Sequence, residues 1–166
     1  MILSNSSPLI YLAKLGKLDV LKELFKEIII PKGVYEEVVI KGKEEKFFDA
    51  LKVENSVKEG WLKVREVVKD KEIEILAPEI DLGEIELISL ARKLNPNLIL
   101  IDDASARTIA ESFGFNVKGT LYILLTAYKK KMIEKNEIRD LINKLIVLGF
   151  RISQELYIRL LEELEK

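Results

Sequence analysis

An unbroken apolar run, Leu98-Ile99-Leu100-Ile101, constrains the fold of this chain more than any other feature. Asn95-Pro96 precedes it and Asp102-Asp103 follows it. A short apolar run between turn-forming residues predicts a strand buried on both faces, as in a parallel sheet. Because such a sheet needs helices over both faces, the run favours an α/β fold.

The rest of the chain alternates strand patterns with helix patterns. Short strands are expected at Met1–Ser4, Glu27–Ile30 and Asn116–Lys118, and a half-exposed edge strand at Trp61–Val68. Helices are expected from Ser7 to a stop at Gly16, over 18–25, from Gly33 to a stop at Gly42, near 47–60, and over 81–94, 104–113, 119–132, 136–148 and 154–165. The segment Lys69–Pro78 is expected to be a charged connector, Asn136 to cap its helix and Ser153 to cap the last one.

This order predicts a three-layer α/β/α fold around a central parallel sheet of about five strands. The sequence has no repeat, no low-complexity segment and no composition break. We therefore expect a single domain over residues 1–166, with residues 136–166 as a C-terminal helical extension.

Asp102 and Asp103 follow the buried strand directly, where a helix is expected to begin. In open α/β sheets, ligands bind in the crevice outside the carboxyl ends of the strands. The alternative is that either aspartate only caps the helix, since Asp is a preferred N-cap residue. One aspartate is enough for a cap, and a second like charge is costly unless a cation is shared. The pair therefore favours a cation or substrate role.

The composition narrows the possible chemistry. The chain of 166 residues has no cysteine and no histidine, which excludes disulfides, thiolate nucleophiles, Cys/His zinc sites and a histidine general base. Carboxylate, hydroxyl, amine and guanidinium groups remain, and oxygen ligands suit hard cations such as Mg²⁺ or Mn²⁺. The net charge of −1 gives no general attraction to nucleic acid, so any basic surface must be local.

The sequence offers no membrane span and no signal peptide, so we expect a cytoplasmic protein. Lysine and glutamate are abundant, and Gln154 is the only glutamine. This composition resembles that of a hyperthermophile's protein.

Other polar residues occupy comparable positions. Asn5 ends the first strand, Glu37 lies on the helix after the second, and Glu84 lies in the first turn of its helix. The carboxyl ends of parallel strands meet at one edge of a sheet, so these side chains can converge with the aspartates. The alternatives are a capping box between Asp81 and Glu84, and a solvated helix face for Glu37.

The ordered set of motifs resembles the PIN-domain family of small Mg²⁺- or Mn²⁺-dependent ribonucleases, which includes the VapC-type toxins. More narrowly, it resembles a PIN-like branch common in archaea and bacteria. The matching segments are Ser4–Ile10, Ile30-Pro31 with Val34 and Glu37, Asp81–Glu84 with Ile88 and Ala91, Ile101–Asp103 with Ala106-Arg107 and Ala110, Val117 with Gly119–Leu121, and Gly149–Ser153.

The resemblance implies a PIN-like fold with an acidic cluster of Glu37, Glu84, Asp102 and Asp103 that holds one or two Mg²⁺ or Mn²⁺ ions. The first-strand position, usually Asp in PIN nucleases, is Asn5 here; an amide oxygen can bind a cation but adds no negative charge. The implied reaction is phosphodiester hydrolysis of RNA. A restraining antitoxin protein and a homodimer are implied as partners.

Further residues have both functional and structural interpretations. Arg107 is expected either to bind a substrate phosphate or to pair with Glu111. Ser6 and Thr120 either hydrogen-bond a ligand or cap helices, and capping is favoured for the serine. Lys129-Lys130-Lys131, with Lys135, either meets the RNA backbone or, as is favoured, interacts with a helix dipole. The sequence has no stretch in which aromatic residues alternate with basic ones. It therefore does not indicate an exposed platform for base stacking.

Two competing functions stay open. The chain is either a PIN-type ribonuclease or a catalytically weak relative that binds RNA or a protein, for which Asn5 is the main support. A receiver-like phosphoacceptor domain is disfavoured, because its acidic pair belongs on the first strand and this first strand ends in Asn5.

Overall fold

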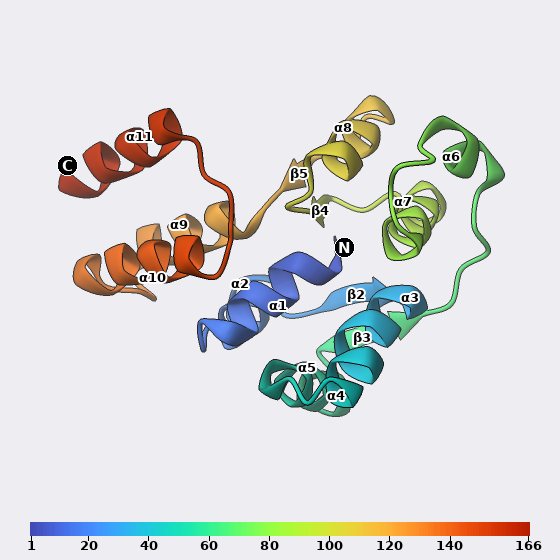
Figure 1. Cartoon of the computed structure of the whole chain (residues 1–166), viewed down its shortest axis with the longest axis horizontal. Coiled ribbons are helices and arrows are strands. Elements are labelled where there is room, and N and C mark those ends of the chain that lie inside the picture. Colours follow the sequence, from blue (N-terminus) through green and yellow to red (C-terminus); the bar gives the residue numbers. More distant parts are fainter. The chain divides into compact units, whose positions relative to one another are not determined.

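The computed structural model describes all residues from Met1 to Lys166 and contains one five-stranded parallel sheet (Figure 1). Its strands are β1 (Ile2–Ser4), β2 (Ile28–Pro31), β3 (Leu62–Arg65), β4 (Leu98–Leu100) and β5 (Val117–Lys118), in the order β3-β2-β1-β4-β5. Strand β3 lies at an edge and is only partly buried, whereas the residues of β2 and β4 are all buried. The predicted parallel α/β fold is confirmed.

Helices cover both faces of the sheet. On the way to β3 the chain forms α1 (Ser6–Lys14), α2 (Asp19–Phe25), α3 (Lys32–Tyr35), the π-helix η1 (Glu36–Lys41), α4 (Gly42–Glu44) and α5 (Phe48–Lys58). The later helices are α6 (Lys71–Leu76), α7 (Leu82–Leu94), α8 (Ala104–Ser112), α9 (Thr120–Lys129), α10 (Lys135–Val147) and α11 (Gln154–Glu165). None of the helices is long and apolar enough to cross a membrane.

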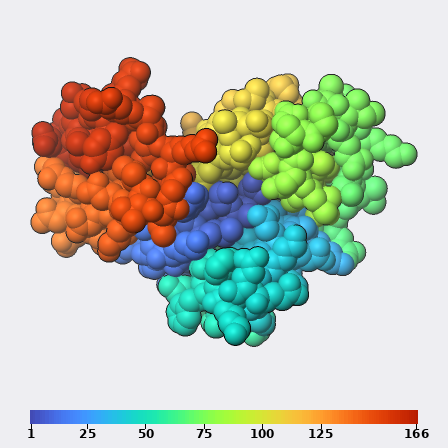
Figure 2. Space-filling model, in the orientation of Figure 1, coloured from blue at the N-terminus to red at the C-terminus, as the bar shows by residue number.

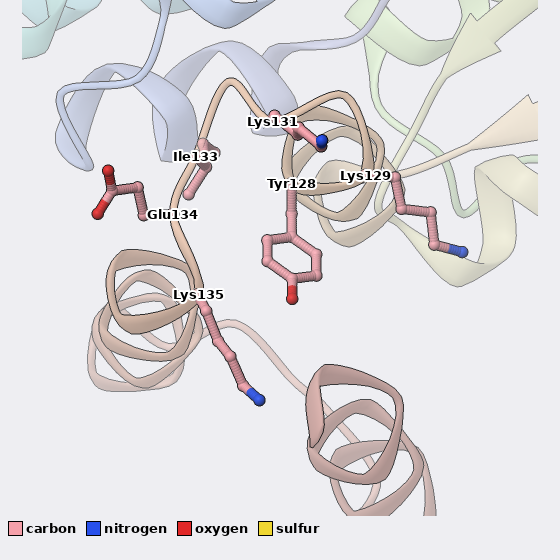
Figure 3. Close-up of a pocket in the computed structure, with 6 residues that line it drawn as sticks. All are labelled: Tyr128, Lys129, Lys131, Ile133, Glu134 and Lys135. Carbon is pink, nitrogen blue, oxygen red and sulfur yellow. The ribbon is translucent and has the colours of Figure 1, made fainter. Parts of the chain in front are cut away.

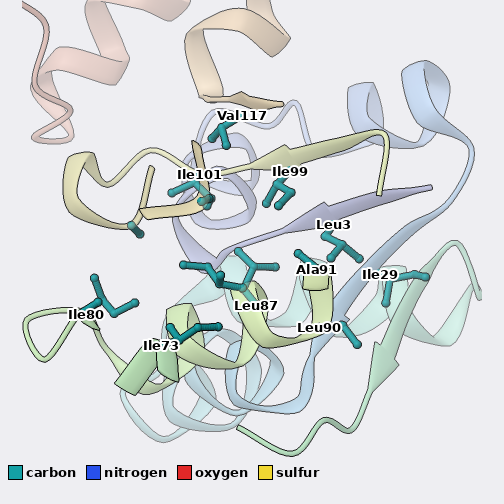
Figure 4. Packing of buried hydrophobic residues seen from close by; sticks show 14 residues of the cluster. Leu3, Ile29, Ile73, Ile80, Leu87, Leu90, Ala91, Ile99, Ile101 and Val117 are labelled. Atoms are coloured by element: carbon teal, nitrogen blue, oxygen red, sulfur yellow. The ribbon is translucent and has the colours of Figure 1, made fainter. Parts of the chain in front are cut away.

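The core between the sheet and helices α6 to α8 is built from aliphatic side chains (Figure 4). Leu3, Ile29 and Ile99 project from neighbouring strands, and their registers pair Leu3 with both of the others. Leu87 and Ala91 of α7 pack against them. This packing fixes the start of α7 near the carboxyl ends of the strands.

The predicted helix stop at Gly42 is wrong. The helix continues through Gly42 into α4, and Gly42 is buried against α5, where an added Cβ would lie 2.9 Å from Ala50 Cβ. The glycine serves close packing rather than chain reversal. The preceding turn is a π-helix, a rare form that is frequently found at functional sites.

Other boundaries also differ from expectation: β3 ends at Arg65 rather than Val68, and α9 ends at Lys129. The predicted connector contains α6, capped by the Asp70 side chain, which accepts a hydrogen bond from Glu72 N at 3.0 Å. Helix α1 begins at Ser6, with Asn5 rather than Ser6 or Ser7 at its N-cap. Helix α10 has Glu134 at its N-cap, so Asn136 lies inside the helix. Ser153 does cap α11, as predicted.

The chain divides into two compact units, Met1–Thr120 and Leu121–Lys166. The first contains the whole sheet. In the second, Lys129 at the end of α9 pairs with Glu163 of α11 at 2.7 Å. This unit includes most of α9 as well as the segment 136–166, and the single domain over 1–166 stays a prediction.

Candidate active site

The strand order reverses between β1 and β4. From β1 the chain proceeds to β2 on one side, whereas β4 and β5 lie on the other. The backbone N–H of Asn5 donates to the carbonyl of Leu100 at 2.9 Å, so the carboxyl ends of β1 and β4 meet here. Such a switch point is where open α/β sheets form their ligand crevice.

Asn5 is buried at this point, with 3% of its surface exposed. Its Nδ2 donates to Glu84 Oε1 at 3.2 Å. Its carbonyl oxygen, Oδ1, is buried and has no hydrogen-bond partner. A buried acceptor without a partner costs roughly 1–3 kcal/mol, which a ligand at this position would recover.

Glu84 is also buried, which is unusual for an ionisable side chain. Its Oε2 accepts from Asp81 N at 3.0 Å, and its own N–H donates to Asp81 Oδ1 at 2.8 Å. The predicted capping box is therefore present, and the same carboxyl group contacts Asn5. Burial raises the pKa of Glu84 from 4.5 to about 7, and the charges of Asp81 and Asp103 act in the same direction.

Glu37 lies on η1, beside the start of α7. Ser6 Oγ donates to Glu37 Oε2 at 2.5 Å, so Ser6 does not cap α1 and its predicted capping role is wrong. An added Cβ at Gly83 would lie 3.5 Å from Glu37 Oε2 and 3.4 Å from Asp81 Oδ1. Glu37 and Asp81 therefore both lie within van der Waals distance of position 83.

A second contact fixes α3 against α7. Glu86 Oε2 accepts from Gly33 N at 2.7 Å, and an added Cβ at Gly33 would lie 2.6 Å from the same oxygen. Glu86 is two residues from Glu84, and Gly33 is four residues from Glu37. The contact therefore positions the segments that carry both acidic side chains.

Asp102 is half-buried and is held by the start of α9. Its Oδ1 accepts from Thr120 N at 2.7 Å and its Oδ2 from Thr120 Oγ1 at 2.6 Å. Burial raises the pKa of Asp102, while the Thr120 hydrogen bonds and the Arg107 charge oppose that rise. Arg107 Nη2 donates to Ile101 O at 2.9 Å, so its guanidinium lies at the end of β4 beside Asp102.

The two aspartates have different structural roles. Asp103 is exposed and caps α8, because its Oδ1 accepts from Ala106 N at 2.9 Å. The capping alternative therefore holds for Asp103, whereas Asp102 binds Thr120 instead. The charge of Asp103 also acts on Glu84, so its carboxylate faces the same region.

A family model described as DUF3368, PIN domain, matches residues 1–166 of this sequence. The chain belongs to the PIN-domain family. A search among curated proteins finds no match to it. PIN domains have a nuclease-type fold, generally depend on divalent metal ions and bind nucleic acid, which is consistent with the fold and the acidic residues described above.

The carboxylates of this PIN domain form three small groups: Glu84 with Asn5, Asp81 and Asp103; Glu37 with Ser6; and Asp102 with Thr120 and Arg107. No three acidic side chains lie close enough together to hold a metal ion as the groups stand. The residues nevertheless fit a hard cation. The donors are all oxygen atoms, and the buried Asn5 Oδ1 lacks a partner. Sequence reasoning treated Asp81 only as a cap; its capping box with Glu84 was the signal for its place here.

The lysine run of this PIN domain lies in the second unit, around a cavity of about 600 Å³ (Figure 3). Lys129, Lys131 and Lys135 line it with Tyr128. Lys129 is the last residue of α9, as the helix-dipole interpretation requires, and its pairing with Glu163 lowers the pKa of that glutamate. Contact of these lysines with RNA stays a prediction.

Proposed function

We propose that this PIN domain is a Mg²⁺- or Mn²⁺-dependent endoribonuclease. The observation that carries the proposal is the buried, unpartnered carbonyl of Asn5 beside the buried carboxyl of Glu84, at the switch point of the sheet. On resemblance alone, the proposal extends to the toxin of a toxin–antitoxin pair, restrained by an antitoxin protein. The homodimer and the cytoplasmic location stay predictions.

The cation would be held by Asn5 Oδ1 with carboxylates from Glu84, Asp102, Asp103 and Glu37. When bound, a divalent cation makes a coordinated water more acidic and stabilises charge on the phosphate. Glu84 must lose a proton to act as a ligand, and its pKa of about 7 allows this at neutral pH.

The neighbouring residues orient the ligands and meet the substrate. Ser6 holds the carboxylate of Glu37, and Thr120 holds that of Asp102 through both of its oxygens. The Arg107 guanidinium has donors beyond the one it gives to Ile101 O, and it is assigned to a phosphate of the RNA.

A catalytically weak RNA- or protein-binding module is the second candidate. Two observations favour it: Asn5 lacks the charge of an aspartate, and no three acidic side chains lie close enough together to hold a metal ion. Metal binding together with metal-dependent cleavage separates the two candidates.

The direct test is a calorimetric titration with Mn²⁺, paired with a cleavage assay on RNA. We expect the parent to bind Mn²⁺, and Asp102→Asn to lose at least tenfold in affinity together with cleavage, because a charged oxygen ligand is removed. Asp140→Asn, an exposed carboxylate on α10, is the matched control and should behave like the parent. Equal Mn²⁺ affinity of Asp102→Asn and the parent would exclude Asp102 as a ligand.

Asn5→Asp tests the departure from the family pattern. The new carboxylate should tighten Mn²⁺ binding roughly tenfold, because affinity rises with the number of charged ligands. Without metal, the variant should unfold at a lower temperature, since it replaces the hydrogen bond to Glu84 by a repulsive pair of carboxylates. Thermal unfolding with EDTA and with Mn²⁺ measures both effects. Unchanged Mn²⁺ affinity would place Asn5 outside the metal site.

A further inference from the structure

A cavity of about 270 Å³ lies between α1 and the helices after β2, and Glu37 is one of the residues that line it. Its apolar wall consists of Ile10, Val38 and Phe47. Its charged lining consists of Lys14, Lys41, Glu45 and Asp49, in addition to Glu37 itself. At this size it lies just below the roughly 300–1,000 Å³ of small-ligand pockets, so it suits one nucleotide rather than a larger ligand.

This cavity shares two lining residues with a hollow beside the candidate active site. Glu37 and Lys41 also line a second hollow of about 240 Å³, together with Gly33, Asp81 and Gly83 at the start of α7. Both shared residues lie on the π-helix η1. A strand of RNA that passes Asp81 and Glu37 therefore has a place for its next nucleotide beside Phe47.

Phe47 offers an aromatic ring at the surface of this cavity. It is 47% exposed, and Lys14 Nζ lies 5.6 Å from the centre of its ring. The close packing of Gly42 on Ala50 fixes the short turn that presents it. Bases of single-stranded RNA stack on such aromatic side chains, and lysines nearby meet the phosphates.

The carboxylates of the cavity add a preference among bases. Asp49 is half-buried in the lining, and a carboxylate accepts hydrogen bonds but donates none. Guanine presents two adjacent N–H donors on its Watson–Crick edge, which one carboxylate can accept together. Adenine presents a single amino group there, next to an acceptor that a carboxylate would repel.

We propose that this cavity binds a guanosine of single-stranded RNA next to the cleavage site, with the base on Phe47, its edge at Asp49 and its phosphate at Lys14 and Lys41. The proposal rests on the proposed function for its substrate class. Ile40, Phe48 and Leu51 are also exposed, and this segment, turquoise in Figure 2, would suit a protein as well. The two lysines of the cavity, Lys14 and Lys41, favour a ligand that carries phosphates.

The test is fluorescence anisotropy with labelled uridine heptamers that carry one central guanosine, inosine or adenosine. EDTA is present, so binding is measured without cleavage. The parent should bind the guanosine heptamer several-fold more tightly than the adenosine one. Phe47→Ala should weaken binding of the guanosine heptamer about tenfold, as expected for one lost stacking contact. Asp49→Asn should remove the preference for guanosine and strengthen adenosine binding, because the amide accepts from the amino group of adenine and donates to its N1.

Phe48→Ala is the matched control, because Phe48 is a neighbouring phenylalanine, 73% exposed, outside the cavity lining. Equal losses in Phe47→Ala and Phe48→Ala, or no base preference in the parent, would overturn the proposal. So would a change of oligomeric state in Phe47→Ala with RNA binding intact, which would assign the surface to a protein contact. Failure of metal-dependent cleavage with guanosine binding intact would instead reject the nuclease function and keep the binding site.

Discussion

Glu84→Gln is expected to abolish metal-dependent cleavage and, at pH 8 without metal, to stabilise the protein by on the order of 2–3 kcal/mol. The parent buries a carboxyl group whose pKa is raised to about 7, mainly by desolvation. At pH 8 that group is charged and buried, whereas glutamine stays neutral. Glutamine also serves in a capping box, so the start of α7 should stay intact.

The pH dependence has a defined sign. A carboxyl group whose folded pKa lies above its unfolded value near 4.5 gives stability that is complete below pH 4.5 and lost as the pH rises to about 7. Guanidinium unfolding in EDTA should therefore show similar stability of parent and Glu84→Gln at pH 4.5, and a more stable variant at pH 8. Glu79→Gln, an exposed control, should match the parent at both values. A less stable Glu84→Gln at pH 8 would contradict a Glu84 pKa raised by burial.

Gly119→Ala is expected to disrupt the Asp102 side of the site. The added Cβ would lie 2.6 Å from Asp102 Oδ1 and 2.9 Å from Arg107 Nη2, so the carboxylate must leave Thr120. We expect a stability loss of about 1–3 kcal/mol from overpacking, and a loss of Mn²⁺ affinity and cleavage of roughly a hundredfold.

Gly149→Ala provides the control for Gly119→Ala. Gly149 has a positive φ of 96° and nothing within 4 Å of an added Cβ, so alanine there brings backbone strain without a clash. It should cost about 1 kcal/mol and leave Mn²⁺ affinity unchanged. Calorimetry and thermal unfolding of both variants measure these effects. Parent-like Mn²⁺ binding by Gly119→Ala would show that the position of the Asp102 carboxylate does not matter for the metal.

The apolar runs predicted the sheet correctly because burial on both faces leaves a local pattern, as in Leu98–Leu100. The role of Gly42 was predicted wrongly because the residue that requires its small size, Ala50, lies in the next helix. Helix α6 escaped notice because only Ile73 and Ala77 of that region are buried in the core, too few for a clear period.

The same distinction applies to the candidate site: its local features could be predicted from the sequence, whereas its long-range contacts could not. The Asp81–Glu84 capping box is local, with a spacing of three residues, and the sequence predicted it. The bond from Asn5 to Glu84 spans 79 residues, and that from Ser6 to Glu37 spans 31. Such partners depend on the order of the strands and on how the helices pack, which no local pattern records. The family resemblance indicated which residues converge, but not that Thr120 holds Asp102.

The contact between Gly33 and Glu86 has an evolutionary consequence. One carboxylate oxygen both accepts the Gly33 N–H and occupies the space of a side chain there, so any other residue at position 33 displaces the Glu86 carboxylate and weakens this hydrogen bond. The two positions should therefore vary together among descendants of this chain. Selection for folding alone would preserve Gly33 and Glu86. The positions of Glu37 and Glu84, which lie on the same segments, would be preserved with them. Asn5 Oδ1 has no hydrogen-bond partner within the fold, so selection for ligand binding, rather than for folding, would act on this atom.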